Sequence, residues 1–317
     1  MTAHAGVRAR VRHHPWLART RHLVRTPKGT LLLILAMFVG LSLTLNGLAP
    51  RASLGPLTVV PAIPGLATRI GRRLLASMAV ALIMDGVILR WRRGRWTFPD
   101  GALITALLVG MVSSPFDPWH VAPLATMAGL AGKHLLRRRG VNVLNPAALG
   151  LVVSYYAFDS AHNWWGALPD LARSPGWPLA VFMLYLAALV VAPAAFIIDR
   201  VNRTPLVLTF LVVYFGLFAA AGFTSEAASV SELFVAPDLH AALFFAAFMV
   251  SDPPTSPASW RRQVACGALV AAVACAWFVT TGAASYLPIG LLAGNAVFMG
   301  IWPGSRQAVA PASTLRD

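Results

Sequence analysis

Two asparagines and a basic cluster stand where one apolar segment of the chain ends and the next begins. Lys133 opens the run KHLLRRR, Gly140 follows this run, and Asn142 and Asn145 precede Pro146. Amide and ammonium groups are unfavourable in a bilayer unless they contact other polar groups or a ligand. An amide pair beside a helix N-terminus suits a carbonyl-rich ring or an anion. Asn145 before Pro146 is also a good helix N-cap, and capping does not explain Asn142.

A second polar turn, Met249 to Pro257 (MVSDPPTSP), follows a short apolar segment. Its prolines restrict the backbone, and its polar side chains are those of Ser251, Asp252, Thr255 and Ser256. Two interpretations are open: a surface turn in which Asp252 caps the next segment, or the lining of a cavity at the membrane edge. We predict that this turn and the asparagine stretch form the two halves of one site.

The composition predicts an all-α polytopic membrane protein. Of its 317 residues, 57% are hydrophobic and 12% are charged, whereas soluble proteins are about 25% charged. Several apolar runs approach the ~20 residues that cross a bilayer. The chain offers about ten such segments: 30–49, 74–89, 102–112, 121–136, 146–158, 179–198, 206–221, 241–250, 264–281 and 286–302.

The positions of the basic residues predict the orientation of the chain in the membrane. The formal net charge is +15, and most of the 26 Lys and Arg fall in loops that share one side if the N-terminus is inside the cell. Such a bias is typical of cytoplasmic loops, so we expect an inner-membrane protein with both termini cytoplasmic and no nucleic-acid partner. Residues 101–136 fit either two spans or a re-entrant hairpin.

A weak internal repeat divides the chain into two halves. ALITALLVGMVSSP (102–115) matches ALFFAAFMVSDPP (242–254) at the spacing that also separates Gly150 from Gly290. Five segments in each half would invert the second half relative to the first, which places a binding site between the halves. We predict a cytoplasmic tail over 1–29, five-helix repeats over 30–158 and 179–303, an outer loop over 159–178 and a cytoplasmic tail over 304–317.

Other reactive residues do not form a recognisable catalytic or metal site. Cys266 and Cys275 are the only cysteines, and an iron–sulfur cluster needs about four thiolates. We therefore predict no metal ligands and no catalytic residue. Asp85 is an acid inside an apolar segment. Two interpretations are open: a functional role, or a carboxylate that simply pairs with Arg90 or snorkels toward the inner surface.

Three stretches of the chain resemble the RnfD/NqrB family, the membrane subunits RnfD of Rnf-type electron transport complexes and NqrB of Na+-translocating NADH:quinone reductase. These stretches are PDGALITALLVGMVSSP (99–115), GKHLLRRRGVNVLNPAALG (132–150) and FMVSDPPTSP (248–257). The resemblance covers most of residues 30–303 and makes the chain a divergent member. It implies ten transmembrane helices in two inverted five-helix repeats, a fold similar to that of urea transporters.

The resemblance implies a membrane protein that binds a flavin or quinone noncovalently between its repeats, beside other membrane or redox subunits and with possible coupling to ion translocation. We expect Lys133 and the neighbouring arginines to favour a reduced, anionic ring. The other implied cofactor-binding residues are Asn142, Asn145 and Pro146 from the first repeat and Ser251, Asp252, Thr255 and Ser256 from the second.

One departure from the family limits the cofactor. Relatives commonly carry Ser-Gly-Ala-Thr in the loop after the Asn-Pro helix, where the threonine bears covalent FMN. Here that loop reads DSAHNWWGALPDLARSPGW (159–177), without the motif, and the nearest string, TGAAS (281–285), lies in another loop. We therefore expect noncovalent riboflavin or FMN rather than covalent FMN. A small-solute transporter or channel of the same fold is the alternative, because a fold does not fix a function.

Overall fold

The computed structural model describes residues 26–47, 65–138, 141–167, 192–224 and 238–301. Helices account for most of these residues. Two strands of two residues each, β1 (Arg137–Arg138) and β2 (Val141–Asn142), form a small antiparallel pair with Arg137 opposite Asn142. Three helices are long and apolar enough to cross a membrane. These findings confirm the predicted class of all-α membrane protein.

The first part of the chain forms five helices and one short turn, at positions close to the predicted apolar segments. They are α2 (Pro27–Gly47), α3 (Leu66–Arg93), α4 (Asp100–Val112), α5 (Val121–Leu135), α6 (Pro146–Phe158) and the 3₁₀ turn η1 (Trp165–Ala167). The helix α3 is longer than its predicted apolar segment, because arginine favours helix as well as leucine does. Its ends are set by Gly65 and Gly94, which both adopt positive φ.

The described residues of the second part form five α-helices, two π-helical segments and one 3₁₀ turn. They are α8 (Ala192–Arg200), α9 (Thr204–Thr224), α11 (Asp238–Phe245) with the π segment η4 (Ala246–Val250), the 3₁₀ turn η5 (Pro253–Thr255), α12 (Trp260–Thr281), and α13 (Tyr286–Asn295) with the π segment η6 (Ala296–Ile301). Of the predicted segment 179–198, only the part from residue 192 onward is described. Most of the predicted tails 1–29 and 304–317 lies outside the described residues.

Among the described residues, α3, α9 and α12 are long and apolar enough to cross a membrane, whereas α4, α5, α6 and α13 are shorter. The α4 and α5 helices form a hairpin, since the ammonium of Lys133 lies 3.7 Å from where a Cβ on Gly101 would be. Each is shorter than the ~20 residues that span a bilayer. Ten spans, the domain boundaries, and the choice between two spans and a re-entrant hairpin over 101–136 stay predictions.

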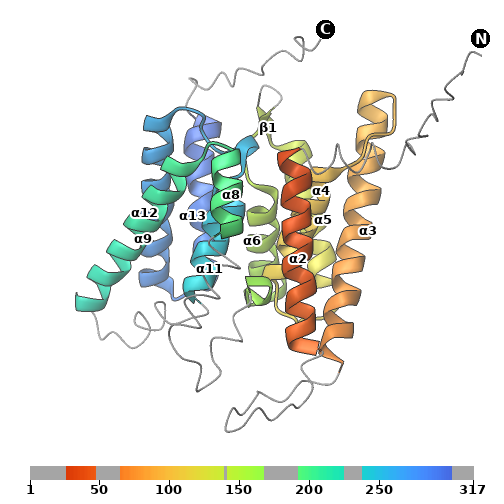
Figure 1. Cartoon of the computed structure of the whole chain (residues 1–317), viewed down its shortest axis with the longest axis horizontal. Helices are drawn as coiled ribbons and strands as arrows, with labels where there is room; N and C mark the ends of the chain where they lie inside the picture. The colour runs from red at the N-terminus through yellow and green to blue at the C-terminus, as the bar shows by residue number, and fades with distance from the viewer. Residues whose placement is uncertain (1–25, 48–64, 139–140, 168–191, 225–237, 302–317) are drawn as a thin grey trace, which may run out of the picture.

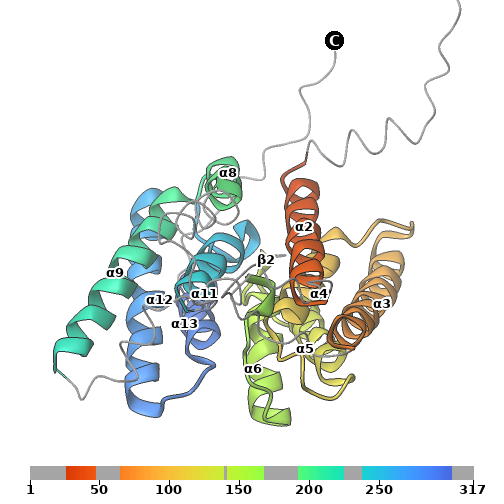
Figure 2. The ribbon, with the colours of Figure 1, turned by 60° about the horizontal axis from the view of Figure 1, so that its bottom comes forward.

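The helices form two groups that lie side by side, one from each part of the chain. Figure 1 and Figure 2 show α2 to α6 on one side and α8 to α13 on the other, and α6 contacts α13 between them. Aromatic rings extend this contact: Phe38 of α2 lies 5.8 Å from Phe248 of η4, and Trp164 lies 6.2 Å from Phe245, between ring centroids. One continuous core therefore joins the two groups.

Glycines allow close backbone contact within each group. A Cβ on Gly150 of α6 would overlap the carbonyl oxygen of Ala125 in α5. In the second group, a Cβ on Gly290 of α13 would lie 2.6 Å from the carbonyl oxygen of Val270 in α12. Small residues at helix contacts in membranes let backbones approach each other, so these two glycines determine how α5–α6 and α12–α13 pack.

We predict that Gly150→Ala lowers the free energy of unfolding by about 1–3 kcal/mol, because the new methyl group forces α6 away from α5. The matched control is Gly216→Ala in α9, where nothing lies within 4 Å of the new Cβ. Alanine there should leave stability unchanged or raise it by up to about 1 kcal/mol. Unfolding of the purified protein in mixed detergent micelles measures both, and equal stability of the two variants would contradict the close contact.

Candidate functional site

Asn145 begins α6 in the manner that the sequence predicts. Its side-chain Oδ1 accepts a hydrogen bond of 3.0 Å from the backbone N–H of Ala148, and Pro146 occupies the first turn. The carbonyl group of Pro146 lies against Gly129 of α5, where a Cβ would overlap it. The predicted N-cap is therefore confirmed, and Pro146 packs against a neighbouring helix.

A second buried asparagine, Asn295 at the end of α13, connects Asn145 to the other half of the molecule. The backbone N–H of Asn145 donates to Oδ1 of Asn295 at 2.8 Å, and Nδ2 of Asn295 donates to the carbonyl oxygen of Thr255 at 2.8 Å. Nδ2 of Asn145 also donates to the carbonyl oxygen of Met249, at 3.3 Å. We call these three bonds the junction. They bring the two predicted polar stretches together, although their contact with a ligand stays a prediction.

The turn after η4 is closed by its own hydroxyl groups. Ser251 donates to the carbonyl oxygen of Ala247, and Thr255 donates to the carboxylate of Asp252 at 2.8 Å. Ser256 donates to the carbonyl oxygen of Asp252, also at 2.8 Å. Because these hydroxyl protons are already used, each of the three buried residues can offer a ligand only an acceptor lone pair. Their main role here is to hold the shape of the turn.

Positive charges from several elements surround the carboxyl group of Asp252. Burial raises the pKa of this carboxyl, while the hydrogen bond from Thr255 and the charges of Lys28, Arg203 and Lys133 oppose the rise. The buried guanidinium of Arg203 also donates from Nε to the hydroxyl of Ser256 at 2.7 Å. The turn thus lies between cationic side chains of both helix groups.

Asn142 lies beside this turn and carries an unused acceptor. It belongs to β2, which contacts η5, and its Oδ1 atom is buried without a hydrogen-bond partner within the part of the chain that the structure describes. A buried polar atom without a partner is unfavourable by about 1–3 kcal/mol, so it marks a place for water or a ligand. Asn142 lies in β2 and Asn145 is the N-cap of α6, so the two amides belong to different elements.

Lys133 makes its closest contacts with a buried acid. Its ammonium lies 3.0 and 3.1 Å from the two carboxylate oxygens of Asp85 in α3, and Nε2 of His134 lies 2.6 Å from one of them. Asp85 is 1% exposed. The predicted pair of Asp85 with Arg90 is wrong, because the cationic and imidazole groups that contact Asp85 belong to Lys133 and His134 of α5. Most of the charge of Lys133 is therefore compensated by Asp85.

Sequence reasoning missed Asn295, His134 and Arg203, which are all buried and all hydrogen-bonded in or beside the site. Asn295 was detectable, since an amide within the apolar segment 286–302 meets the same criterion that singled out Asp85. The partners of His134 and Arg203 are far away in the sequence, at Asp85 and Ser256, so no local pattern indicates these contacts.

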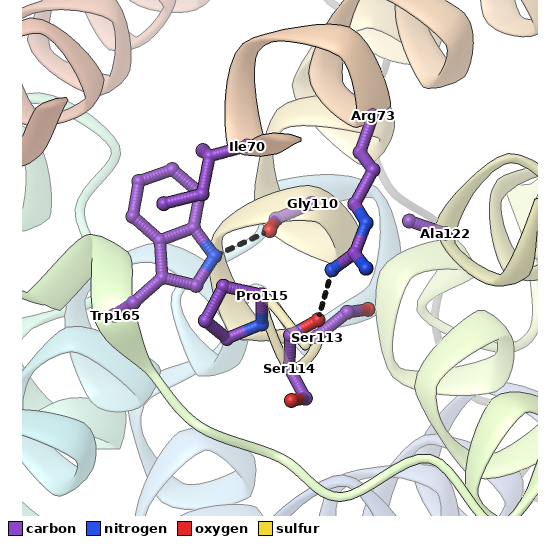
Figure 3. A pocket seen from close by; sticks show the side chains of 8 residues that line it. All are labelled: Ile70, Arg73, Gly110, Ser113, Ser114, Pro115, Ala122 and Trp165. Carbon is purple, nitrogen blue, oxygen red and sulfur yellow. Dashed lines mark hydrogen bonds between the residues drawn. The ribbon is translucent and has the colours of Figure 1, made fainter. Parts of the chain in front are cut away.

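A small pocket lies at the other end of α4 and is separate from the junction. Figure 3 shows Arg73 donating to the carbonyl oxygen of Ser114 at 2.7 Å and the indole of Trp165 donating to that of Gly110 at 2.8 Å. The pocket volume of ≈ 10 Å³ has room for one water molecule. It is too small for a cofactor ring. Across the described ranges no cluster of three His, Cys, Asp or Glu side chains could hold a metal ion.

Comparisons with known proteins find a matching family model and several relatives. The family model described as "NQR2, RnfD, RnfE family" matches residues 29–298. Curated relatives named as the D subunits of ion-translocating oxidoreductase complexes are 37% identical over 102 residues in Pseudomonas paraeruginosa, 32% over 127 in Sodalis glossinidius and 28% over 160 in Shewanella amazonensis. These matches cover 30%, 38% and 47% of this chain and 30%, 37% and 46% of the relatives, so each spans less than half of either protein.

We predict that Asp85→Ala lowers the free energy of unfolding by about 3 kcal/mol, because it leaves the ammonium of Lys133 without its carboxylate in a buried position. The double variant Asp85→Ala/Lys133→Met should recover part of this loss, since no unmatched charge remains. Asp199→Ala, which removes an exposed acid of α8, is the control. If Asp85→Ala were no worse than Asp199→Ala in micellar unfolding, the ion pair would not be a stabilising contact.

Asn295→Ala should lower the free energy of unfolding by about 1–3 kcal/mol, because the N–H of Asn145 and the carbonyl of Thr255 both lose a buried partner. Asn142→Ala is the matched amide control. It removes an acceptor that has no partner among the described residues, so stability should not fall and should rise by up to about 1–3 kcal/mol. A comparable loss in both variants, measured in the same unfolding experiment, would show that the junction has no special role.

Proposed function

This chain belongs to the NQR2, RnfD, RnfE family, and on that premise we propose that it is an integral membrane component of an Rnf- or Nqr-like electron transport system. It binds a flavin or quinone noncovalently between its two halves. Relatives named as parts of ion-translocating oxidoreductase complexes support partner redox or membrane subunits and coupling to ion movement. The family membership rests on the match of the family model to residues 29–298, whereas the individual relatives match shorter stretches of this chain.

The observation that carries this proposal is the meeting of two broken-helix regions at the junction. The start of α6, the end of α13 and the turn at η5 are joined by Asn145, Asn295 and Thr255. Irregular backbone at membrane depth is stable only where protein surrounds it or where it lines a cavity. The unused acceptor of Asn142 beside η5 supports a polar ligand at this place.

The residues divide into those that form the walls and those that contact the ring. Asn145, Ser251, Thr255 and Ser256 are buried and hydrogen-bonded within the protein, and Pro146 is buried against Gly129, so all five fix the walls. Asn142, Lys133 and Asp252 keep some surface and would hold the ring carbonyls and imide. A bound flavin supplies one- and two-electron transfer, and the protein supplies position and electrostatics.

The electrostatic contribution of this site comes from a compensated set of charges. Asp85 neutralises much of Lys133, so Lys133 can donate a hydrogen bond without leaving a full charge unmatched. The exposed arginines of β1 add positive potential close to Asn142. This potential favours an anionic, reduced ring over a neutral one.

We further propose that the two halves are inverted five-helix repeats, that the chain crosses the inner membrane ten times and that both termini are cytoplasmic. The matching close contacts at Gly150 and Gly290 support the repeat. Exposed arginines are more numerous at the C-terminal end of α3 and in β1 than at the start of α3, and this excess supports the orientation, since basic residues favour the cytoplasmic side.

We predict that the purified protein carries a flavin that denaturation releases, without a covalent remainder. Asn142→Ala should lower flavin occupancy about tenfold, since a polar ligand loses a bond to a buried partner. Asn163→Ala, which removes an exposed amide in another segment, should retain it. Absorbance and extraction measure the occupancy.

A colourless protein that releases no flavin and binds no added riboflavin or quinone would contradict this function. The alternative, a small-solute transporter, would then be favoured if the cofactor-free protein carried a small polar solute across proteoliposome membranes. Because Asn142→Ala is expected to keep its stability, loss of flavin in that variant reports on the site rather than on unfolding.

A further inference from the structure

The C-terminal half of α3 has an apolar, exposed stripe. Ile83, Val87 and Trp91 follow one another at intervals of four residues and are 67%, 55% and 83% exposed. Residues four apart lie on the same side of a helix. Figures 1 and 2 both show α3 along one edge of the molecule. In a helix long enough to cross a membrane, such a stripe faces the acyl chains.

The stripe ends in a basic and aromatic segment, which we call the RW segment: residues 90–98, RWRRGRWTF. Its four arginines and both tryptophans are exposed, and Gly94 ends α3 by adopting positive φ. No acid occurs between Asp85 and Asp100. Asp85 binds Lys133, and Asp100 lies 3.5 Å from Lys28, so both flanking acids have other cationic partners.

We propose that the RW segment binds the phosphodiester headgroup of an anionic phospholipid whose acyl chains lie along the α3 stripe. Tryptophan rings favour the headgroup level of a bilayer, and Trp91 continues the lipid-facing stripe into that level. Arginine forms paired hydrogen bonds to phosphate oxygens. The guanidinium groups of Arg90, Arg93 and Arg95 serve this purpose, whereas Arg92 donates to the carbonyl oxygen of His134 at 3.4 Å.

The opposite end of the same helix provides a matched comparison. Arg69 and Arg72 are also exposed there, yet residues 65–73 include no aromatic side chain. Arg73 lies beside Asp117, whose charge acts on it. The residues of α3 at this end therefore supply arginines without interfacial rings of their own, and an acid lies beside Arg73, so this end should bind a headgroup more weakly. The lipid site is independent of any flavin, because the RW segment lies outside the junction.

The test compares two double variants that remove equal charge from the two ends of α3: Arg90→Gln/Arg93→Gln and Arg69→Gln/Arg72→Gln. Full-length protein in a neutral detergent is titrated with phosphatidylglycerol or phosphatidylcholine of identical acyl chains, and bound lipid is counted by native mass spectrometry. We expect wild-type protein to prefer phosphatidylglycerol. Arg90→Gln/Arg93→Gln should bind it at least about tenfold more weakly, and Arg69→Gln/Arg72→Gln should bind it as wild type does.

Two further measurements separate the lipid from other ligands. Trp91→Ala should weaken phosphatidylglycerol binding with all arginines present, and inorganic phosphate should not displace the lipid. Equal affinity for the two lipids, or equal losses in the two double variants, would overturn the proposal. Displacement by inorganic phosphate would also overturn it, because the segment would then bind a free anion. The proposal would fail as well if Arg90→Gln/Arg93→Gln lost a co-purified acidic protein while its lipid binding stayed unchanged, because the segment would then bind a partner protein.

Discussion

The structure depends on hydrogen bonds that satisfy the backbone groups left free where helices end in the protein interior. At the junction, α6 starts, α13 ends and the η5 turn reverses the chain, and each of these features frees N–H or carbonyl groups. Asn145 and Asn295 satisfy them with three hydrogen bonds of 2.8 to 3.3 Å. A buried backbone group without a partner is unfavourable by about 1–3 kcal/mol. The two helix groups can therefore meet through irregular segments only because these amides bridge them.

Buried ionisable groups on either side of the junction also have polar partners. In the first group, Asp85 is buried against Lys133 and His134. In the second group, the buried guanidinium of Arg203 donates to Ser256 and to the backbone carbonyls of Val201 and Asn202. Both clusters hold ionisable groups that would be unstable alone in the apolar surroundings. Each also fixes an element that lines the proposed site, α5 in one case and the η5 turn in the other.

Much of this architecture could be predicted from local sequence, and the rest depends on distant contacts. Hydropathy indicated the helices, Asn145 before Pro146 indicated the start of α6, and the two polar stretches do meet. Hydropathy alone underestimated α3, whose ends are arginine-rich yet helical. The partner of Asp85 was not local, since α5 contributes Lys133 from another segment. Asn295 was overlooked, although an amide within an apolar run meets the criterion that singled out Asp85.

The two π-helical segments give the junction a dependence on helix register. Met249 lies within η4, and Asn295 immediately precedes η6, so both groups bonded to Asn145 are at or beside a widened turn. A π turn holds one residue more than the α turn that it replaces. Conversion to α-helix would turn the residues beyond it by about 100° about the helix axis. The hydrogen bonds of Asn145 to Met249 and Asn295 therefore favour the π-helical over the α-helical conformation of η4 and η6.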